Sequence, residues 1–220
     1  MRYKIDCAEI RSENAAKTMA EASAFLVDWL RSKPRVNNSL DYGCGKLRYS
    51  KYLARRCLRL SLVDSKVQLE RSQVINKQVT NVIRYAHKHW PTCRTYTVEQ
   101  FWAGVEERYD FVLCANVLSA IPSRIIRARS LRAIKACLRP EGQCLVVNQH
   151  ANSYFKEAPK RAGATPHLDG WLLPSGRGAC YYGILSREKT IRILRAVGFK
   201  VLDAWVEGQS TFVLVARGEV

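Results

Sequence analysis

The chain has 220 residues, of which 47% are hydrophobic; this proportion excludes a disordered chain and suits one globular domain. Its 36 lysines and arginines against 19 acids give a net charge of +17, which favours contact with polyanions but identifies no chemistry. The first residues lack the apolar core of a signal peptide, and no apolar run approaches the roughly 18 residues of a membrane-spanning helix, so we expect a cytoplasmic protein with no membrane partner.

Helical and strand periodicities alternate along most of the chain. In chain order they predict helix 12–31, strand 36–42, helix 50–56, strand 58–63, helix 66–79, strands 92–98 and 109–115, helix 123–138, strand 143–148, helix 186–197, and strands 200–206 and 211–216. This alternation predicts an α/β fold with a doubly wound, mostly parallel sheet of about seven strands and a C-terminal antiparallel hairpin.

We expect a single domain over residues 1–220. Its parts are an N-terminal helical segment 1–33, a core formed by 36–150 and 184–217, and an insertion 158–183. The insertion contains many glycines and prolines, together with Trp171, Tyr181 and Tyr182. A long irregular loop is often a functional lid, and the aromatic residues favour that role over an idle insertion.

The eight cysteines include no C-x-x-C pair, and most lie in apolar runs. Cysteine in such a run behaves as a small buried hydrophobic residue. We therefore expect reduced thiols and no metal site.

The helix predicted over 123–138 is strongly basic. Positions 124 to 139 contain no acidic residue. Their cations are Arg124, Arg127, Arg129, Arg132, Lys135 and Arg139. Most of these charges fall on one side of the helix, opposite Leu131, Ile134 and Leu138. This side is either an ordinary solvated face or a surface that binds a polyanion such as nucleic acid.

Two strand ends carry residues suited to a cofactor. The segment Asp41-Tyr42-Gly43-Cys44-Gly45 follows one strand, and glycine there lets the backbone approach a ligand closely. Asp64 ends the next strand, where a carboxylate can accept hydrogen bonds from both ribose hydroxyls. Ligands of open α/β sheets bind at the carboxyl ends of strands, so the pair predicts an adenosine-type cofactor. Enzymes that use NAD share these features.

Other segments separate the chain from the NAD enzymes. The loop continues as Lys46-Leu47-Arg48 without the third glycine of the dinucleotide fingerprint, and an acid, Asp41, precedes the first glycine. The set resembles the class I S-adenosylmethionine-dependent methyltransferases. The segments that carry the resemblance are Asp41–Gly45, Leu62-Val63-Asp64, the strand and turn over 109–118, the turn 138–143 and the closing hairpin.

The resemblance implies S-adenosyl-L-methionine as cofactor and a role for each matching residue. Asp41, Tyr42, Gly43 and Gly45 would surround the methionine moiety, Asp64 and Ser65 would bind the ribose, Glu99 and Gln100 would flank the adenine, and Asn116 and Val117 would line the other side. Leu47 departs from the family pattern, in which a glycine is common.

The acceptor is less well defined. A general base, where the acceptor needs one, is expected after the fifth strand at His150 or Tyr154, with four further candidates in the insertion: His167, Asp169, Tyr181 and Tyr182. The segment 114–118 lacks the Pro-Pro-aromatic motif of enzymes that methylate exocyclic amines of DNA bases. We therefore expect a small-molecule acceptor. The alternatives are an RNA methyltransferase, an inactive nucleic-acid-binding module and a nicotinamide oxidoreductase.

Overall fold

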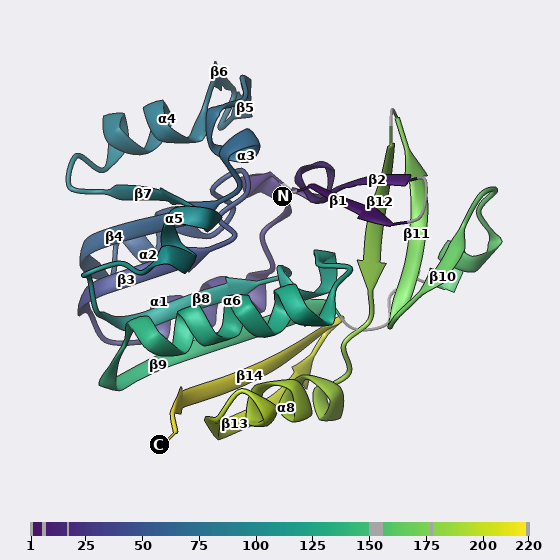
Figure 1. Cartoon of the computed structure of the whole chain (residues 1–220). Coiled ribbons are helices and arrows are strands. Elements are labelled where there is room, and N and C mark those ends of the chain that lie inside the picture. Colours follow the sequence, from purple (N-terminus) through teal and green to yellow (C-terminus); the bar gives the residue numbers. More distant parts are fainter. Residues whose placement is uncertain (1, 6–7, 17, 150–155, 177, 219–220) are drawn as a thin grey trace.

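The computed structural model describes residues 2–5, 8–16, 18–149, 156–176 and 178–218. These residues form a large sheet with helices on both faces and a smaller sheet that stands beside it (Figure 1). The smaller sheet lies at the carboxyl ends of the parallel strands, where it shares a cavity with them.

The large sheet has seven strands, as predicted, and their order is β13-β14-β9-β8-β3-β4-β7. Their bounds are β3 Val36–Tyr42, β4 Cys57–Asp64, β7 Arg94–Thr97, β8 Tyr109–Ala115, β9 Leu138–Gln149, β13 Phe199–Glu207 and β14 Ser210–Arg217. Strands β3, β4, β7, β8 and β9 pair in parallel, whereas β14 pairs antiparallel with both β9 and β13. The predicted α/β class and closing hairpin are confirmed.

Helices cover both faces of this sheet because successive strand residues point to opposite sides. On one face, Leu113 and its neighbours pack against α1 Ala24–Ser32, α2 Ser50–Ala54, α3 Lys66–Glu70 and α4 Val82–His89. On the other, Val112 and its neighbours pack against α5 Val98–Ala103, α6 Arg124–Cys137 and α8 Arg187–Ala196. Among the described residues, no helix is both long and apolar enough to cross a membrane.

The polar helix predicted over 66–79 is confirmed over 66–70 and wrong beyond it. Helix α3 ends at Glu70, and the chain then forms a hairpin of β5 Gln73–Ile75 and β6 Gln78–Thr80. Asn76 and Lys77 connect the two strands with φ of +46° and +66°, as a two-residue hairpin turn requires. The helix itself ends earlier, where Arg71 adopts an extended conformation with φ of -63° and ψ of 140°.

The helix predicted over 12–31 is also wrong over its first half. Two short 3-10 helices, η1 Ser12–Ala15 and η2 Met19–Glu21, precede α1. The backbone N and the hydroxyl of Thr18 both donate to the Glu21 carboxylate, which closes a separate turn there. Helix α1 ends at Ser32, before Pro34, as predicted.

The insertion 158–183 is not irregular, contrary to prediction. It forms β10 Thr165–His167, β11 Gly170–Ser175 and β12 Gly178–Gly183, and β12 pairs with an N-terminal hairpin of β1 Arg2–Ile5 and β2 Ala8–Arg11. The resulting small sheet has its own apolar core, formed by Ile10, Leu172, Ala179 and Tyr181. Ile10 is far in the chain from the other three residues of this core, so no local periodicity predicts the sheet.

Helix α6 presents an exposed basic side, but Arg127 is not on it. Leu131 and Ile134 are fully buried, as predicted. Arg127 is also buried, with 2% of its surface exposed, because it forms an ion pair with Asp169. The described cysteines are unbridged, and all of them except Cys180 are buried.

Candidate functional site

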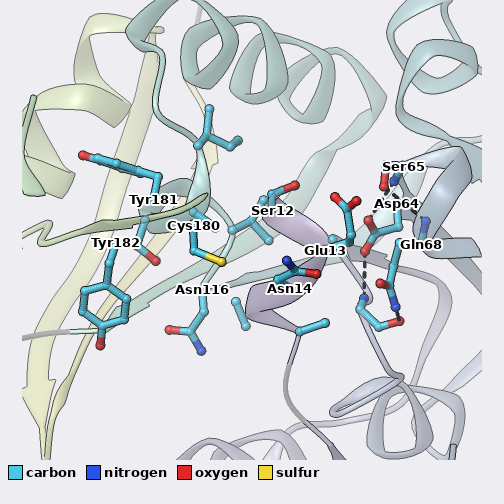
Figure 2. A pocket seen from close by; sticks show the side chains of 18 of the residues that line it. Ser12, Glu13, Asn14, Asp64, Ser65, Gln68, Asn116, Cys180, Tyr181 and Tyr182 are labelled. Carbon is cyan, nitrogen blue, oxygen red and sulfur yellow. Dashed lines mark hydrogen bonds between the residues drawn. The ribbon is translucent and has the colours of Figure 1, made fainter. Parts of the chain in front are cut away.

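A cavity of about 530 Å³ lies between the carboxyl ends of the parallel strands and the small sheet. Figure 2 shows residues 12–14 beside Asp64, Ser65 and Gln68 at one end of it. Strand β12 forms the other end with Cys180 and Tyr182 (Figure 2). All of the predicted cofactor residues except Glu99 and Gln100 therefore share one cavity with residues of the predicted insertion.

The glycine loop packs against the turn that follows the neighbouring strand β8. Gly43 has φ +78°, and a Cβ there would lie 2.3 Å from Cγ2 of Val117, so only glycine fits. Leu47 stands in the place of the usual third glycine and still adopts φ +61°. A leucine in this conformation costs roughly 1–2 kcal/mol, and its complete burial offsets that cost.

Asp64 holds the loop in place. Its Oδ2 accepts a hydrogen bond from the backbone N of Gly45 at 2.8 Å, and its Oδ1 accepts one from the N of Ser65 at 2.7 Å. Burial raises the pKa of the Asp64 carboxyl, although these backbone hydrogen bonds oppose the shift. Each carboxylate oxygen has a further lone pair, so Asp64 can still accept a hydrogen bond from a ligand in the cavity.

Asp41 lies beneath the loop and lines the same cavity. It is 3% exposed and accepts a hydrogen bond from the Ser50 hydroxyl at 2.6 Å. Burial raises the pKa of Asp41 to about 7, the Ser50 hydrogen bond opposes this rise, and the charge of Asp64 adds to it. Glu13 is a third buried carboxylate in the lining. A cation that enters this end of the cavity would stabilise the ionised carboxylates.

The residues predicted to flank an adenine lie in the first turn of α5. Gln100 uses its side chain to cap that helix, where Oε1 accepts from the N of Thr97 at 2.8 Å. Glu99 and Gln100 are both exposed, and within the described residues the cavity is lined by Val98 instead. The structure therefore does not bring this pair to the cavity, and the role of Glu99 stays a prediction.

The residues predicted after the fourth strand do reach the cavity. Asn116 and Val117 both line it, and Asn116 has φ +60°. The buried Oδ1 of Asn116 has no hydrogen-bond partner within the described part of the chain. An unpaired buried oxygen at a cavity wall is suited to a ligand that can donate a hydrogen bond.

The first candidates for a general base, His150 and Tyr154, lie outside the described residues, so both stay predictions. His167 hydrogen-bonds the carbonyl oxygen of Pro122 through Nε2 at 2.9 Å and does not line the cavity. Tyr182 does line it. No group of three or more metal-ligating side chains occurs in the part of the chain that the structure describes.

The other two candidates belong to a buried ion-pair network. Asp169 pairs with Arg127 and with Lys189 of α8. These cations hold the pKa of Asp169 below its usual value, although burial opposes the shift. The hydroxyl of Tyr181 accepts from Nη2 of Arg127 at 3.1 Å and from the N of Asp169 at 3.3 Å. Both side chains are therefore used to hold the small sheet against α6.

Sequence reasoning missed the contribution of η1 and of Gln68. Residues 12–14 line the cavity from a segment that was predicted to be a plain helix. Gln68 donates through Nε2 to the carbonyl oxygen of Gly45 at 2.7 Å and so braces the glycine loop. The position of Gln68, one helical turn after Asp64, could have indicated that it lies at the cofactor end. No local sequence feature indicates that residues 12–14 line the cavity.

Comparison with known proteins gives one family and a consistent fold. A family model described as "Methyltransferase domain" matches residues 10–204. The uncharacterized protein YmfD of Escherichia coli (strain K12) is 36% identical over 215 residues, which cover 98% of this chain and 96% of that protein.

Several solved structures share the fold at low identity. An S-adenosylmethionine-dependent methyltransferase from Clostridium acetobutylicum superposes with a TM-score of 0.64, at 12% identity and 94% coverage of both chains. The 1,6-didemethyltoxoflavin-N1-methyltransferase of Burkholderia thailandensis gives 0.61, at 18% identity, covering 91% of this chain and 78% of that one. The N-methyltransferase NodS of Bradyrhizobium japonicum gives 0.58, at 16% identity, covering 89% and 85%.

Proposed function

Because this chain belongs to the class I S-adenosylmethionine-dependent methyltransferase family, we propose that it methylates a small-molecule acceptor held beneath the small sheet. The cofactor of the family is S-adenosyl-L-methionine. The observation that carries the proposal is the shared cavity, which has the glycine loop at one end and the aromatic strand β12 at the other.

The residues at the loop end fit this cofactor. Asp64 would accept hydrogen bonds from the ribose hydroxyls, and the backbone at Gly43 and Gly45, which lines the cavity, would meet the amino-acid moiety. Asp41 and Glu13 are buried carboxyl groups, and a ligand with a sulfonium and an ammonium group would stabilise their ionised form. When bound, the cofactor supplies a methyl group already activated for transfer.

The work left to the protein is to align the acceptor and to exclude water. Strands β11 and β12 provide the wall for this, with Leu173, Pro174, Cys180 and Tyr182 in the lining. An apolar and aromatic wall over a cavity of about 530 Å³ suits an organic molecule of modest size, since the cofactor must share the same space.

The RNA alternative depends on the exposed basic side of α6. Arg124, Arg129 and Arg132 remain exposed there, whereas Arg127 is withdrawn into the ion-pair network. These exposed arginines are not among the residues that line the cavity. This separation favours the small-molecule acceptor.

Two measurements test the proposal. Titration calorimetry should show binding of S-adenosylmethionine and of S-adenosylhomocysteine but not of NAD; no binding of either sulfur compound would refute the cofactor assignment. Label from methyl-tritiated S-adenosylmethionine should then enter the small-molecule fraction of a cell extract. Label that enters only the RNA fraction would replace the small-molecule acceptor with RNA, and cofactor binding without transfer would support the inactive binding module.

A further inference from the structure

Residues 8–16, which comprise β2 and η1, form a wall of the cavity over the glycine loop. Four of them line the cavity: Ser12, Glu13, Asn14 and Ala16. Figure 2 shows Glu13 beside Asp64, with Ser12 and Asn14 between Asp64 and Cys180. A Cβ added to Gly45 would lie 3.4 Å from the Cβ of Ala16, so the segment rests on the loop at van der Waals distance. A ligand held by the loop therefore also meets this segment.

Arg71, directly after α3, ties the segment to the cofactor end, and Arg2 ties Glu13 to β1 of the same hairpin. Nη2 of Arg71 donates to the backbone oxygen of Glu13 at 2.8 Å, and Nε of Arg2 donates to Oε1 of Glu13 at 3.0 Å. Arg71 is the C-cap residue of α3, the helix that begins directly after Asp64 and Ser65. The helix that follows the proposed ribose-binding carboxylate thus also holds η1 in place.

The same segment is joined to the acceptor end. Strand β2 pairs in parallel with β12 at Ile10 and Ala179, and the next residue, Cys180, lines the cavity. The Sγ of Cys180 lies 3.8 Å from the backbone oxygen of Arg11. Ile10 and Tyr181 also share the apolar core of the small sheet. One sheet therefore carries both a wall of the cofactor end and the wall of the acceptor end.

We infer that residues 12–14 are cofactor-contacting residues and that cofactor binding orders the acceptor wall through the pairing of Ile10 with Ala179. Contacts from the ligand to η1 stabilise β2, and a stabilised β2 reduces the opening of its hydrogen-bonded neighbour β12. Arg71 is a positioning residue in this arrangement. The inference rests on the proposed cofactor site and predicts that cofactor binds before acceptor.

The test is hydrogen exchange of the full chain with and without S-adenosylhomocysteine, read by mass spectrometry. In the natural chain the ligand should slow amide exchange in residues 8–16 and also in 170–183. Arg71→Gln should weaken S-adenosylhomocysteine binding several-fold in calorimetry and reduce the ligand-dependent protection of 170–183. Arg84→Gln, on the exposed side of α4, is the matched control and should change neither.

A second variant disturbs the pairing of β2 with β12, which we call the junction, without touching the proposed cofactor contacts. A Cβ at Gly178 would lie 2.7 Å from the backbone oxygen of Glu9, so Gly178→Ala must push β12 away from β2. We expect ligand-dependent protection to persist in 8–16 and to disappear in 170–183. Gly176→Asn is the control, because a Cβ there meets nothing within 4 Å and asparagine tolerates its φ of +55°.

Three results would overturn the inference. Protection confined to the glycine loop and α3 would show that residues 8–16 do not contact the ligand. Equal protection of 170–183 in the natural chain and in Gly178→Ala would show that the junction transmits nothing. An Arg71→Gln variant with unchanged affinity and protection would remove the positioning role. Absence of any S-adenosylhomocysteine binding is a separate result, since it refutes the proposed cofactor site itself.

Discussion

Nη1 of Arg127 lies 2.5 Å from Oδ2 of Asp169, and the two side chains are only 2% and 4% exposed. The same guanidinium donates through Nε to the backbone oxygen of Ile121 at 2.9 Å. A cation from the most basic helix of the chain therefore lies inside the protein, where it joins α6 to the turn between β10 and β11. This pair attaches the acceptor wall to the main body of the fold.

Removal of the guanidinium should leave Asp169 buried with less compensation. We expect Arg127→Gln to lower the free energy of unfolding by about 3–5 kcal/mol, the range for breaking one side of a buried ion pair. Urea unfolding followed by circular dichroism measures the change. Arg124→Gln on the exposed side of α6 should shift stability by less than about 0.5 kcal/mol. Equal changes in the free energy of unfolding for the two variants would show that the buried ion pair stabilises the fold no more than an exposed arginine does.

Asp64 should be needed for cofactor binding. Asp64→Asn removes a charged acceptor, and hydrogen bonds to a charged group contribute about 1.5–3 kcal/mol. We expect the affinity for S-adenosylhomocysteine to fall by about ten- to a hundredfold, measured by calorimetry. Asp203→Asn, exposed on β13, is the matched control. An unchanged affinity in Asp64→Asn would contradict the ribose assignment.

Asp41 should make stability depend on pH. Its pKa is about 7 in the folded chain, against an ordinary value of 3.8, so the folded state binds the proton more tightly than the unfolded state. The free energy of unfolding should therefore fall as pH rises from about 4 to 7 and level off above. Asp41→Asn cannot ionise, so its stability relative to the natural chain should rise over that window. A difference that is flat with pH would contradict the shifted pKa.

Gly43 should tolerate no side chain while Val117 is present. Gly43→Ala places a Cβ 2.3 Å from Cγ2 of Val117 and also costs roughly 1–2 kcal/mol for alanine at positive φ. We expect a loss of more than about 2 kcal/mol in urea unfolding, together with weaker cofactor binding. Val117→Ala in the same chain removes the clashing methyls and should recover part of the loss. A double variant no more stable than Gly43→Ala would place the strain elsewhere.

Local sequence patterns predict the large sheet and the position of the cofactor end. Each element of the cofactor end is formed by contiguous residues: the strand that ends at Tyr42, the glycine turn and the strand that ends at Asp64. The local pattern of each segment therefore predicts its structure correctly. The carboxyl ends of adjacent parallel strands meet at one edge of the sheet, which brings Asp41 and Asp64 into one cavity. The hydrophobic periodicity of these two strands is a local property, so it can be read directly from the sequence.

The residues opposite the glycine loop follow from long-range pairing, which local patterns do not predict. Arg127 was predicted on a charged face because the sequence does not show its partner, which is 42 positions away. Residues 8–16 are expected from the sequence to begin or precede a helix, yet Ala8–Arg11 form a strand that pairs with β12, and the contact from Cys180 to Arg11 spans 169 positions. Ion pairs and strand pairing depend on the partner that the fold supplies, and local propensity is too weak to specify that partner.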